Sequence, residues 1–208
     1  MSLSHVWMRR GLLLAAAALS LALIVPATGL AAKFGGKLRN TDGSVIQPTA
    51  PRAGYTCKQA DSSLGNDPCT RVAVSFDKGS PGGHAKAPKD GIINKINVVA
   101  SGPGHFRLFM ARVRGGNKAK VRKKGPAMTY TGDHSAPYTI EHLPLHLRVK
   151  KGDYLSIRSR KTSMLSCTSG SVRQLLYEPP LVVGDPLETA NGTDDCSLLI
   201  QAVYKGHH

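Results

Sequence analysis

The sequence has few aromatic and few acidic side chains. Phenylalanine, tyrosine and tryptophan make up 5% of the 208 residues, and the one tryptophan, Trp7, lies near the N-terminus. Modules that stack sugars or nucleobases need exposed aromatic rings, so the composition argues against neutral-sugar binding and against sequence-specific nucleic-acid recognition. Only 13 acids oppose 28 basic residues, and most of the acids are in Gly- or Pro-containing segments typical of turns.

Motifs that identify common enzymes and metal sites are also missing. No serine has the flanking glycines of a nucleophile elbow, and neither a P-loop nor an H-E-x-x-H motif occurs. His142 and His146 have the spacing of a helical zinc pair, but Pro144 lies between them, and four residues of a strand span about 13 Å. Close C-x-x-C pairs are absent. We therefore predict no metal site, no cofactor and no assigned catalytic residue.

Residues 1–32 have the layout of a secretory signal peptide. Two arginines precede an apolar run at 11–25, Pro26 ends the run, and Ala31 and Ala32 offer small residues for a signal peptidase. The alternative is a membrane anchor, because the apolar stretch extended over 11–32 is long enough to span a bilayer. We predict cleavage, secretion and no transmembrane span in the processed chain. The remainder keeps an excess of 13 positive charges.

All four cysteines lie in the part of the chain that is predicted to be exported. An even number of cysteines in an oxidising compartment favours disulfides over metal ligation. Four cysteines allow three pairings, and we favour Cys57 with Cys69 and Cys167 with Cys196. The first pair encloses a loop rich in Asp, Ser, Gly and Pro, and the second encloses a connection between predicted strands.

The hydrophobic pattern after residue 70 has a period of two. Residues 33–70 show no sustained period and carry several prolines, so we expect an irregular N-terminal arm. From 71 onward apolar and polar residues alternate, as in Val72, Val74 and Phe76. We predict strands at 71–76, 92–100, 105–114, 127–131, 138–149, 154–160, 172–177 and 197–204, with a hairpin turn at 101–104. No helical period occurs, which predicts one all-β domain over 71–208, an antiparallel sandwich or barrel.

Several pieces of the chain resemble a group of uncharacterised secreted β-sandwich proteins from actinobacteria. The matching pieces are the sequences at 90–96 (DGIINKI), 106–109 (FRLF), 143–155 (LPLHLRVKKGDYL), 178–181 (EPPL) and 198–202 (LLIQA). They lie between residues 88 and 205, a little over half of the chain. The resemblance implies an extracytoplasmic location and a jelly-roll-like β-sandwich, and it carries no catalytic motif.

The most distinctive segment is 112–124, which places seven cations among 13 residues without an acid. Read as a hairpin with its tip at 115–117, alternation puts Arg112 and Arg114 on one face. It puts Lys118, Lys120 and Arg122 on the face of the returning strand. A second cationic group flanks the turn between the predicted strands at 138–149 and 154–160. The predicted ligand-binding residues are Arg112, Arg114, Lys118, Lys120, Arg122, Lys123, Lys124, Lys150, Lys151, Arg158 and Arg160.

These observations favour a secreted, non-catalytic protein that associates with an anionic polysaccharide or cell-wall polymer through this cationic face. The alternative without a ligand is a solvated strand whose lysines prevent edge-to-edge pairing of sheets. Two other functions stay open. One is a small secreted hydrolase that uses His142 or His134 with Glu141 or Glu178. The other is a structural or partner-binding envelope protein. The sequence does not specify an oligomeric state.

Overall fold

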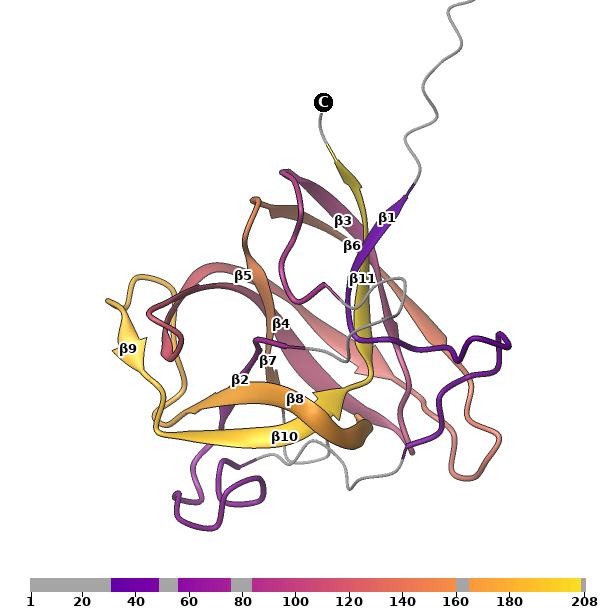
Figure 1. The fold of residues 1–208 in the computed structure, drawn as a ribbon, viewed down its shortest axis with the longest axis horizontal. Helices are drawn as coiled ribbons and strands as arrows, with labels where there is room; N and C mark the ends of the chain where they lie inside the picture. The colour runs from indigo at the N-terminus through magenta and orange to yellow at the C-terminus, as the bar shows by residue number, and fades with distance from the viewer. Residues whose placement is uncertain (1–30, 49–55, 76–83, 160–164, 207–208) are drawn as a thin grey trace, which may run out of the picture.

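The computed structural model describes residues 31–48, 56–75, 84–159 and 165–206, and shows two antiparallel sheets packed on each other (Figure 1). The four-stranded sheet has the order β1 (Ala32–Gly35), β11 (Ile200–Gly206), β3 (Gly91–Val98), β6 (Glu141–Val149). The seven-stranded sheet has the order β10 (Gly192–Leu198), β8 (Cys167–Tyr177), β2 (Thr70–Ala73), β7 (Tyr154–Ser159), β4 (Gly104–Arg114), β5 (Lys118–Tyr130), β9 (Glu188–Thr189). The described ranges contain no helix, and thus none that could cross a bilayer. The predicted all-β sandwich is confirmed.

The main core lies between the two sheets. Phe106, Leu108 and Met110, which alternate along β4, are all completely buried there, together with Leu155 and Ile157 of the neighbouring strand β7. Ile96 and Val98 of β3 and Tyr204 of β11 close the core from the four-stranded sheet. The period of two in the sequence therefore corresponds to one face of each strand turned inward.

The seven-stranded sheet buries its second face as well. Phe109 and Ala111, the residues between the core positions of β4, pack with Tyr154, Tyr177 and Leu181 in a separate apolar cluster. Leu181 belongs to the segment between β8 and β9, so this connection covers the sheet from outside. Burial on both faces explains why the sequence of β7 is apolar or small at nearly every position.

Two of the connections that carry the chain from one sheet to the other differ from the prediction. The turn at 101–104 was predicted to join a hairpin, but β3 and β4 lie in different sheets. Residues 197–204, predicted as one strand, are divided at Leu199 between β10 and β11, which also lie in different sheets. The N–H of Leu199 donates to Ser166 O, and Leu199 O accepts the N–H of Val99. The connection after β3 and the bend between β10 and β11 are therefore hydrogen-bonded to each other. Alternation marks which residues face inward but not which sheet a strand joins.

Both predicted disulfides are confirmed. Cys57 and Cys69 have Cα atoms 4.9 Å apart and pack with Leu176 of β8, so this disulfide holds the N-terminal arm on the seven-stranded sheet. Cys167 and Cys196, with Cα atoms 5.5 Å apart, join the adjacent strands β8 and β10.

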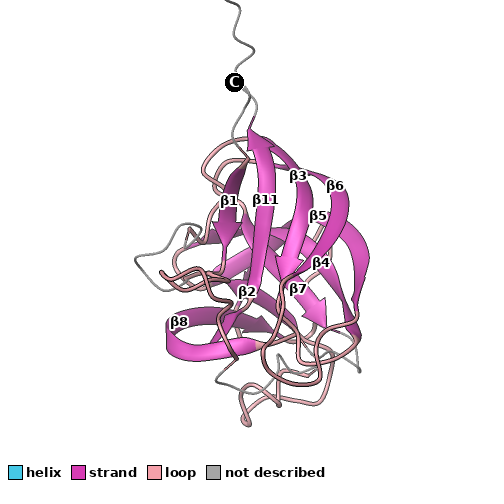
Figure 2. Cartoon of the chain, turned by 90° about the vertical axis from the view of Figure 1, so that its right-hand side faces the viewer, coloured by secondary structure: helices cyan, strands magenta, loops and turns pink. Residues whose placement is uncertain are grey.

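The N-terminal arm is less irregular than predicted. Ala32, placed in the signal peptide by the sequence, begins β1 and pairs with Tyr204 of β11 (Figure 2). The strand predicted at 71–76 is shorter, since β2 ends at Ala73, and Phe76 lies outside the described residues. The predicted strands at 127–131 and 172–177 are the ends of the longer strands β5 and β8.

Candidate polyanion-binding surface

The cationic segment forms the predicted hairpin, whose far end lies beside β9 (Figure 1). Strands β4 and β5 pair from Gly104 with Tyr130 to Arg114 with Lys118, and the connection is residues 115–117. Gly115 and Gly116 have φ angles of +58° and +81°, a backbone region that residues with a Cβ rarely adopt. This pair of glycines allows the chain to reverse within a few residues and places the cations of both strands next to each other.

The strand register puts like charges directly opposite each other. Arg114 faces Lys118, and Arg112 faces Lys120. Residues paired in this way share a face of the sheet, so the four cations lie on one face rather than being separated by strand. Facing like charges destabilise an antiparallel pair. The fold therefore tolerates an electrostatic cost at this hairpin.

Asp153 neutralises part of this charge. Its carboxylate is 4% exposed and accepts from Arg112 Nη2 at 2.8 Å and from Arg122 Nη1 at 3.5 Å. Its other oxygen accepts the backbone N–H of Lys150 at 2.9 Å. Arg122 lies where the β4–β5 register shifts. Two of the predicted binding residues therefore have a structural role in attaching the hairpin to the β6–β7 turn.

The second cationic group is only partly on this surface. The guanidinium of Arg112 lies close to Gly152, which brings the turn containing Lys150 and Lys151 beside the hairpin. Lys150 forms an exposed ion pair with Asp90 at 2.9 Å, and Lys151 is exposed. The two cationic groups of the sequence are thus neighbours at this turn.

Arg158 belongs to a different environment. Its guanidinium lies 5.3 Å from the centre of the Phe109 ring, and its Nη2 donates to Leu181 O at 2.7 Å. Burial lowers the pKa of Arg158, and the nearby positive charge of Arg107 lowers it further. Arg158 therefore faces the outer apolar cluster and not the hairpin charges. Arg160 lies outside the described residues.

Six exposed cations remain, which we name the hairpin surface: Arg114, Lys118, Lys120, Lys123, Lys124 and Lys151. Lys124 pairs with Phe109 and so lies on the other face of β5 from Lys118 and Lys120. None of the six forms an ion pair within the described residues. The nearest acid by strand register is Glu188 of β9, which faces Ala119. Because successive residues of β5 alternate in direction, Glu188 lies on the face opposite Lys118 and Lys120.

Aromatic side chains are not part of this surface. Among the described residues, the large exposed apolar side chains are Val182, Val183 and Leu187, and none is aromatic. Stacking on the rings of sugars or bases needs exposed aromatic side chains. The hairpin surface is therefore suited to recognise charge and not ring shape.

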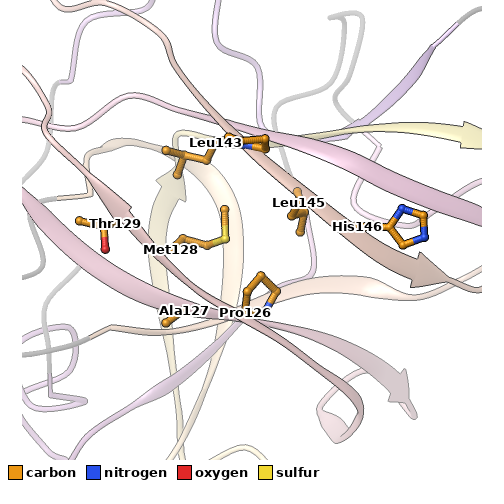
Figure 3. Close-up of a pocket in the computed structure, with 8 residues that line it drawn as sticks. Pro126, Ala127, Met128, Thr129, Leu143, Leu145 and His146 are labelled. Carbon is orange, nitrogen blue, oxygen red and sulfur yellow. The ribbon is translucent and has the colours of Figure 1, made fainter.

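A slot opens where β5 and β6 separate at the edge of the sandwich (Figure 3). Its volume is about 420 Å³. The side chain of Leu147 approaches Gly125 at one end, and Glu141 accepts backbone N–H groups of Thr131 and Gly132 at the other. The lining is mainly apolar and contains no acid; it consists of Pro126, Ala127, Met128, Thr129, Leu143, Pro144, Leu145 and His146.

The residues of the hydrolase alternative do not converge in this slot. Glu141 binds the loop after β5, and Glu178 accepts the N–H groups of Gly65 and Asp67 in the N-terminal arm. His142 Nδ1 donates to Asn97 Oδ1, 2.7 Å away. His134 is exposed in the loop between β5 and β6. Both glutamates therefore have structural partners, and no acid and histidine of this set share the slot.

Sequence reasoning missed the role of Asp153. Asp153 belongs to the turn between β6 and β7, and its carboxylate is the anion that holds the hairpin arginines. Asp194 lies not in a turn but in β10, and it pairs with Arg71 at 2.6 Å. Both acids are distant in sequence from their arginines, so no local pattern contains the signal.

Comparisons with known proteins identify no relative: no family model, curated protein or solved structure matches the chain. The resemblance to secreted actinobacterial sandwiches therefore stays a prediction.

Proposed function

We propose that this protein is a secreted, non-catalytic β-sandwich that associates with an anionic cell-surface polymer through the hairpin surface. The observation that carries the proposal is the pairing of Arg114 with Lys118 and of Arg112 with Lys120. Asp153 compensates Arg112, but no acid within the described residues compensates the other pair or the lysines that follow it. A bound polyanion would relieve this repulsion.

The alternative explanation, that lysines only protect a sheet edge, accounts for less of this arrangement. Edge protection requires charges on the outermost strand. Lys118 lies where β5 pairs with β9, and Arg114 lies on β4, which has β5 beside it. These two cations are therefore not at an open edge, and repelling another sheet does not explain them.

Two disulfides are compatible with an oxidising, extracytoplasmic location, where wall polymers and acidic polysaccharides carry phosphate or carboxylate groups. Because the surface lacks exposed rings, we expect binding to depend on charge density and not on sugar identity. Charge-based binding weakens as salt shortens the Debye length to about 8 Å at physiological ionic strength.

The test is retention on purified wall or acidic polysaccharide at low and at physiological salt. We expect the variant with Lys118, Lys120, Lys123 and Lys124 changed to Gln to lose most retention at low salt, because these four cations supply most of the uncompensated charge of the hairpin surface. Wild type should lose retention as salt is raised.

The matched control removes the same number of charges from the four-stranded sheet, at Lys33, Lys95, Arg148 and Lys205. This control should be retained like wild type. Equal retention of wild type and hairpin variant contradicts the proposal. Salt-independent retention of both would favour the partner-binding envelope protein instead.

A further inference from the structure

The outward face of the four-stranded sheet carries a second set of cations that the sequence analysis did not assign. Across the strands, Lys33 of β1 pairs with Val203 of β11, and Val203 pairs with Lys95 of β3. In the same way Lys205 of β11 pairs with Ile92 of β3, which pairs with Arg148 of β6. The flanking residues Phe34, Ala202 and Tyr204 are in the core, so these two rows face outward.

Each row consists of a cation, an aliphatic residue and a second cation. Neighbouring strands lie about 4.8 Å apart, so the cations of one row are about 10 Å apart. The second row is displaced by one strand relative to the first. We name the four cations Lys33, Lys95, Arg148 and Lys205 the outer-sheet surface. It is a two-dimensional array on a continuous sheet, unlike the projecting hairpin.

No acid balances this array within the described residues. Glu141, at the start of β6, accepts from Thr131 and Gly132, and Asp90, before β3, accepts from Lys150 and Lys151. None of the four cations forms an ion pair in the described ranges.

The row beyond Lys33 and Lys95 contains no acid and is hydrogen-bonded from the residue after β1 to β6. Gln201 Nε2 donates to Gly36 O at 3.1 Å, and Asn97 Nδ2 donates to Gln201 Oε1 at 3.3 Å. A backbone carbonyl only accepts, so the donor and acceptor of each hydrogen bond in this series are fixed. Asn97 Oδ1 therefore accepts from Nδ1 of His142. This ordered row bounds the outer-sheet surface on one side without adding negative charge.

The outer-sheet surface lies at the end of the sheet where the chain enters the fold. Ala32 pairs with Tyr204, so Lys33 and Lys205 are close to the point where the N-terminal segment joins β1 (Figure 2). Ala32 lies seven positions after the end of the apolar run at 11–25. Seven residues span at most about 25 Å. A chain whose apolar run enters a bilayer during export or anchoring therefore brings this surface close to the headgroups.

We propose that the outer-sheet surface docks on the anionic headgroup layer of a lipid bilayer. The two rows together can contact many negative headgroups at once, whereas a single polymer chain would follow only one of the rows. Each basic side chain held near an anionic leaflet adds to membrane attraction. Together with the hairpin surface, this would give the protein two separate anionic contacts, membrane on one and polymer on the other. The lipid proposal does not depend on the polymer proposal.

The test is co-sedimentation with vesicles of phosphatidylcholine alone and of phosphatidylcholine mixed with phosphatidylglycerol. The chain is purified as the host exports it, and its N-terminus is sequenced so that all variants are compared with the same ends. Binding to phosphatidylcholine reports any retained apolar segment, and the increase caused by phosphatidylglycerol reports the charged surface. We expect this increase to fall about tenfold or more in the variant with Lys33, Lys95, Arg148 and Lys205 changed to Gln.

The control is the hairpin variant with Lys118, Lys120, Lys123 and Lys124 changed to Gln, which has the same net charge. It should keep the phosphatidylglycerol-dependent binding within a factor of about three, because the lost cations are not on the docking face. Equal loss of phosphatidylglycerol-dependent binding in both variants would mean that net charge alone acts. No loss in the outer-sheet variant would mean that this face is not used. Either result overturns the proposal. If the outer-sheet variant lost polymer retention but kept vesicle binding, the face would be a polymer site, which also overturns it.

Discussion

At the scale of single residues, buried charge determines which arginines are structural. The side chain of Arg71 is fully buried, pairs with Asp194 at 2.6 Å and reaches Thr56 O at 3.5 Å. Burial lowers the pKa of Arg71, and the charge of Asp194 opposes this shift. The pair joins β2 to β10. Its contribution depends on both partners being present.

We expect Asp194→Ala to lower the free energy of unfolding by about 3–5 kcal/mol, because it leaves an uncompensated cation in the interior. The measurement is chemical denaturation near neutral pH. Combining Asp194→Ala with Arg71→Met should recover a large part of the loss, since it removes the charge as well as its partner. A single variant as stable as wild type would show that Arg71 reaches solvent.

The cationic residues show why residue roles were only partly predictable. Counting charges found the segment 112–124, and six of the eleven predicted binding residues are exposed without an ion pair in the described structure. Arg112 and Arg122 are bound to Asp153, and Arg158 lies over Phe109. These partners are between 31 and 49 positions away in sequence, so only the folded arrangement separates structural cations from available ones.

At the scale of elements, the hairpin depends on contacts with β8 and β9. The Asn117 carbonyl accepts the Tyr177 hydroxyl at 3.1 Å and the Ala190 N–H at 2.9 Å. Burial raises the pKa of Tyr177, so its hydroxyl keeps its proton and continues to donate at pH values where exposed tyrosines ionise. Two elements far along the chain thus hold the turn that presents the hairpin surface.

We expect Tyr177→Phe to loosen the hairpin end with a modest loss of stability, about 1 kcal/mol, because one hydrogen bond is removed while the ring stays packed. Amide hydrogen exchange should accelerate at residues 114–118 and stay unchanged in β3 and β6. The Ala190 contact remains as an internal control. Uniform acceleration throughout the molecule, or none at the turn, would contradict a local tether.

The pattern of strands was predictable, but their partners were not. Alternation located β4, β6 and β7 and identified Phe106, Leu108 and Met110 as one face. It did not reveal that β3 and β4 belong to different sheets, nor that residues 197–204 bend at Leu199. Sheet membership depends on contacts across the whole chain, which a local period does not contain.

At the scale of the whole molecule, the disulfides differ in what they connect. Cys57–Cys69 closes a loop of 12 positions within the arm, and Cys167–Cys196 closes one of 29 positions between neighbouring strands. In the chain-entropy account the larger loop gives the larger constraint on the unfolded state.

We expect replacement of Cys167 and Cys196 by Ser to lower the free energy of unfolding by about 3–4 kcal/mol, and replacement of Cys57 and Cys69 to lower it somewhat less. Thermal and denaturant unfolding of both double variants, compared under oxidising conditions, measures the difference. The reverse order would mean that packing of the Cys57–Cys69 pair against Leu176 outweighs loop length.

The strand order of the four-stranded sheet determines when its strands can pair during synthesis. Strand β11 is last in the chain, yet it lies between β1 and β3, and β1 has no other strand partner among the described residues. A chain that leaves the ribosome N-terminus first therefore carries β1 unpaired until β11 has been made. Until then, β1 and the open side of β3 are exposed to mispairing, and a truncation that removes β11 takes away the centre of the sheet rather than its margin.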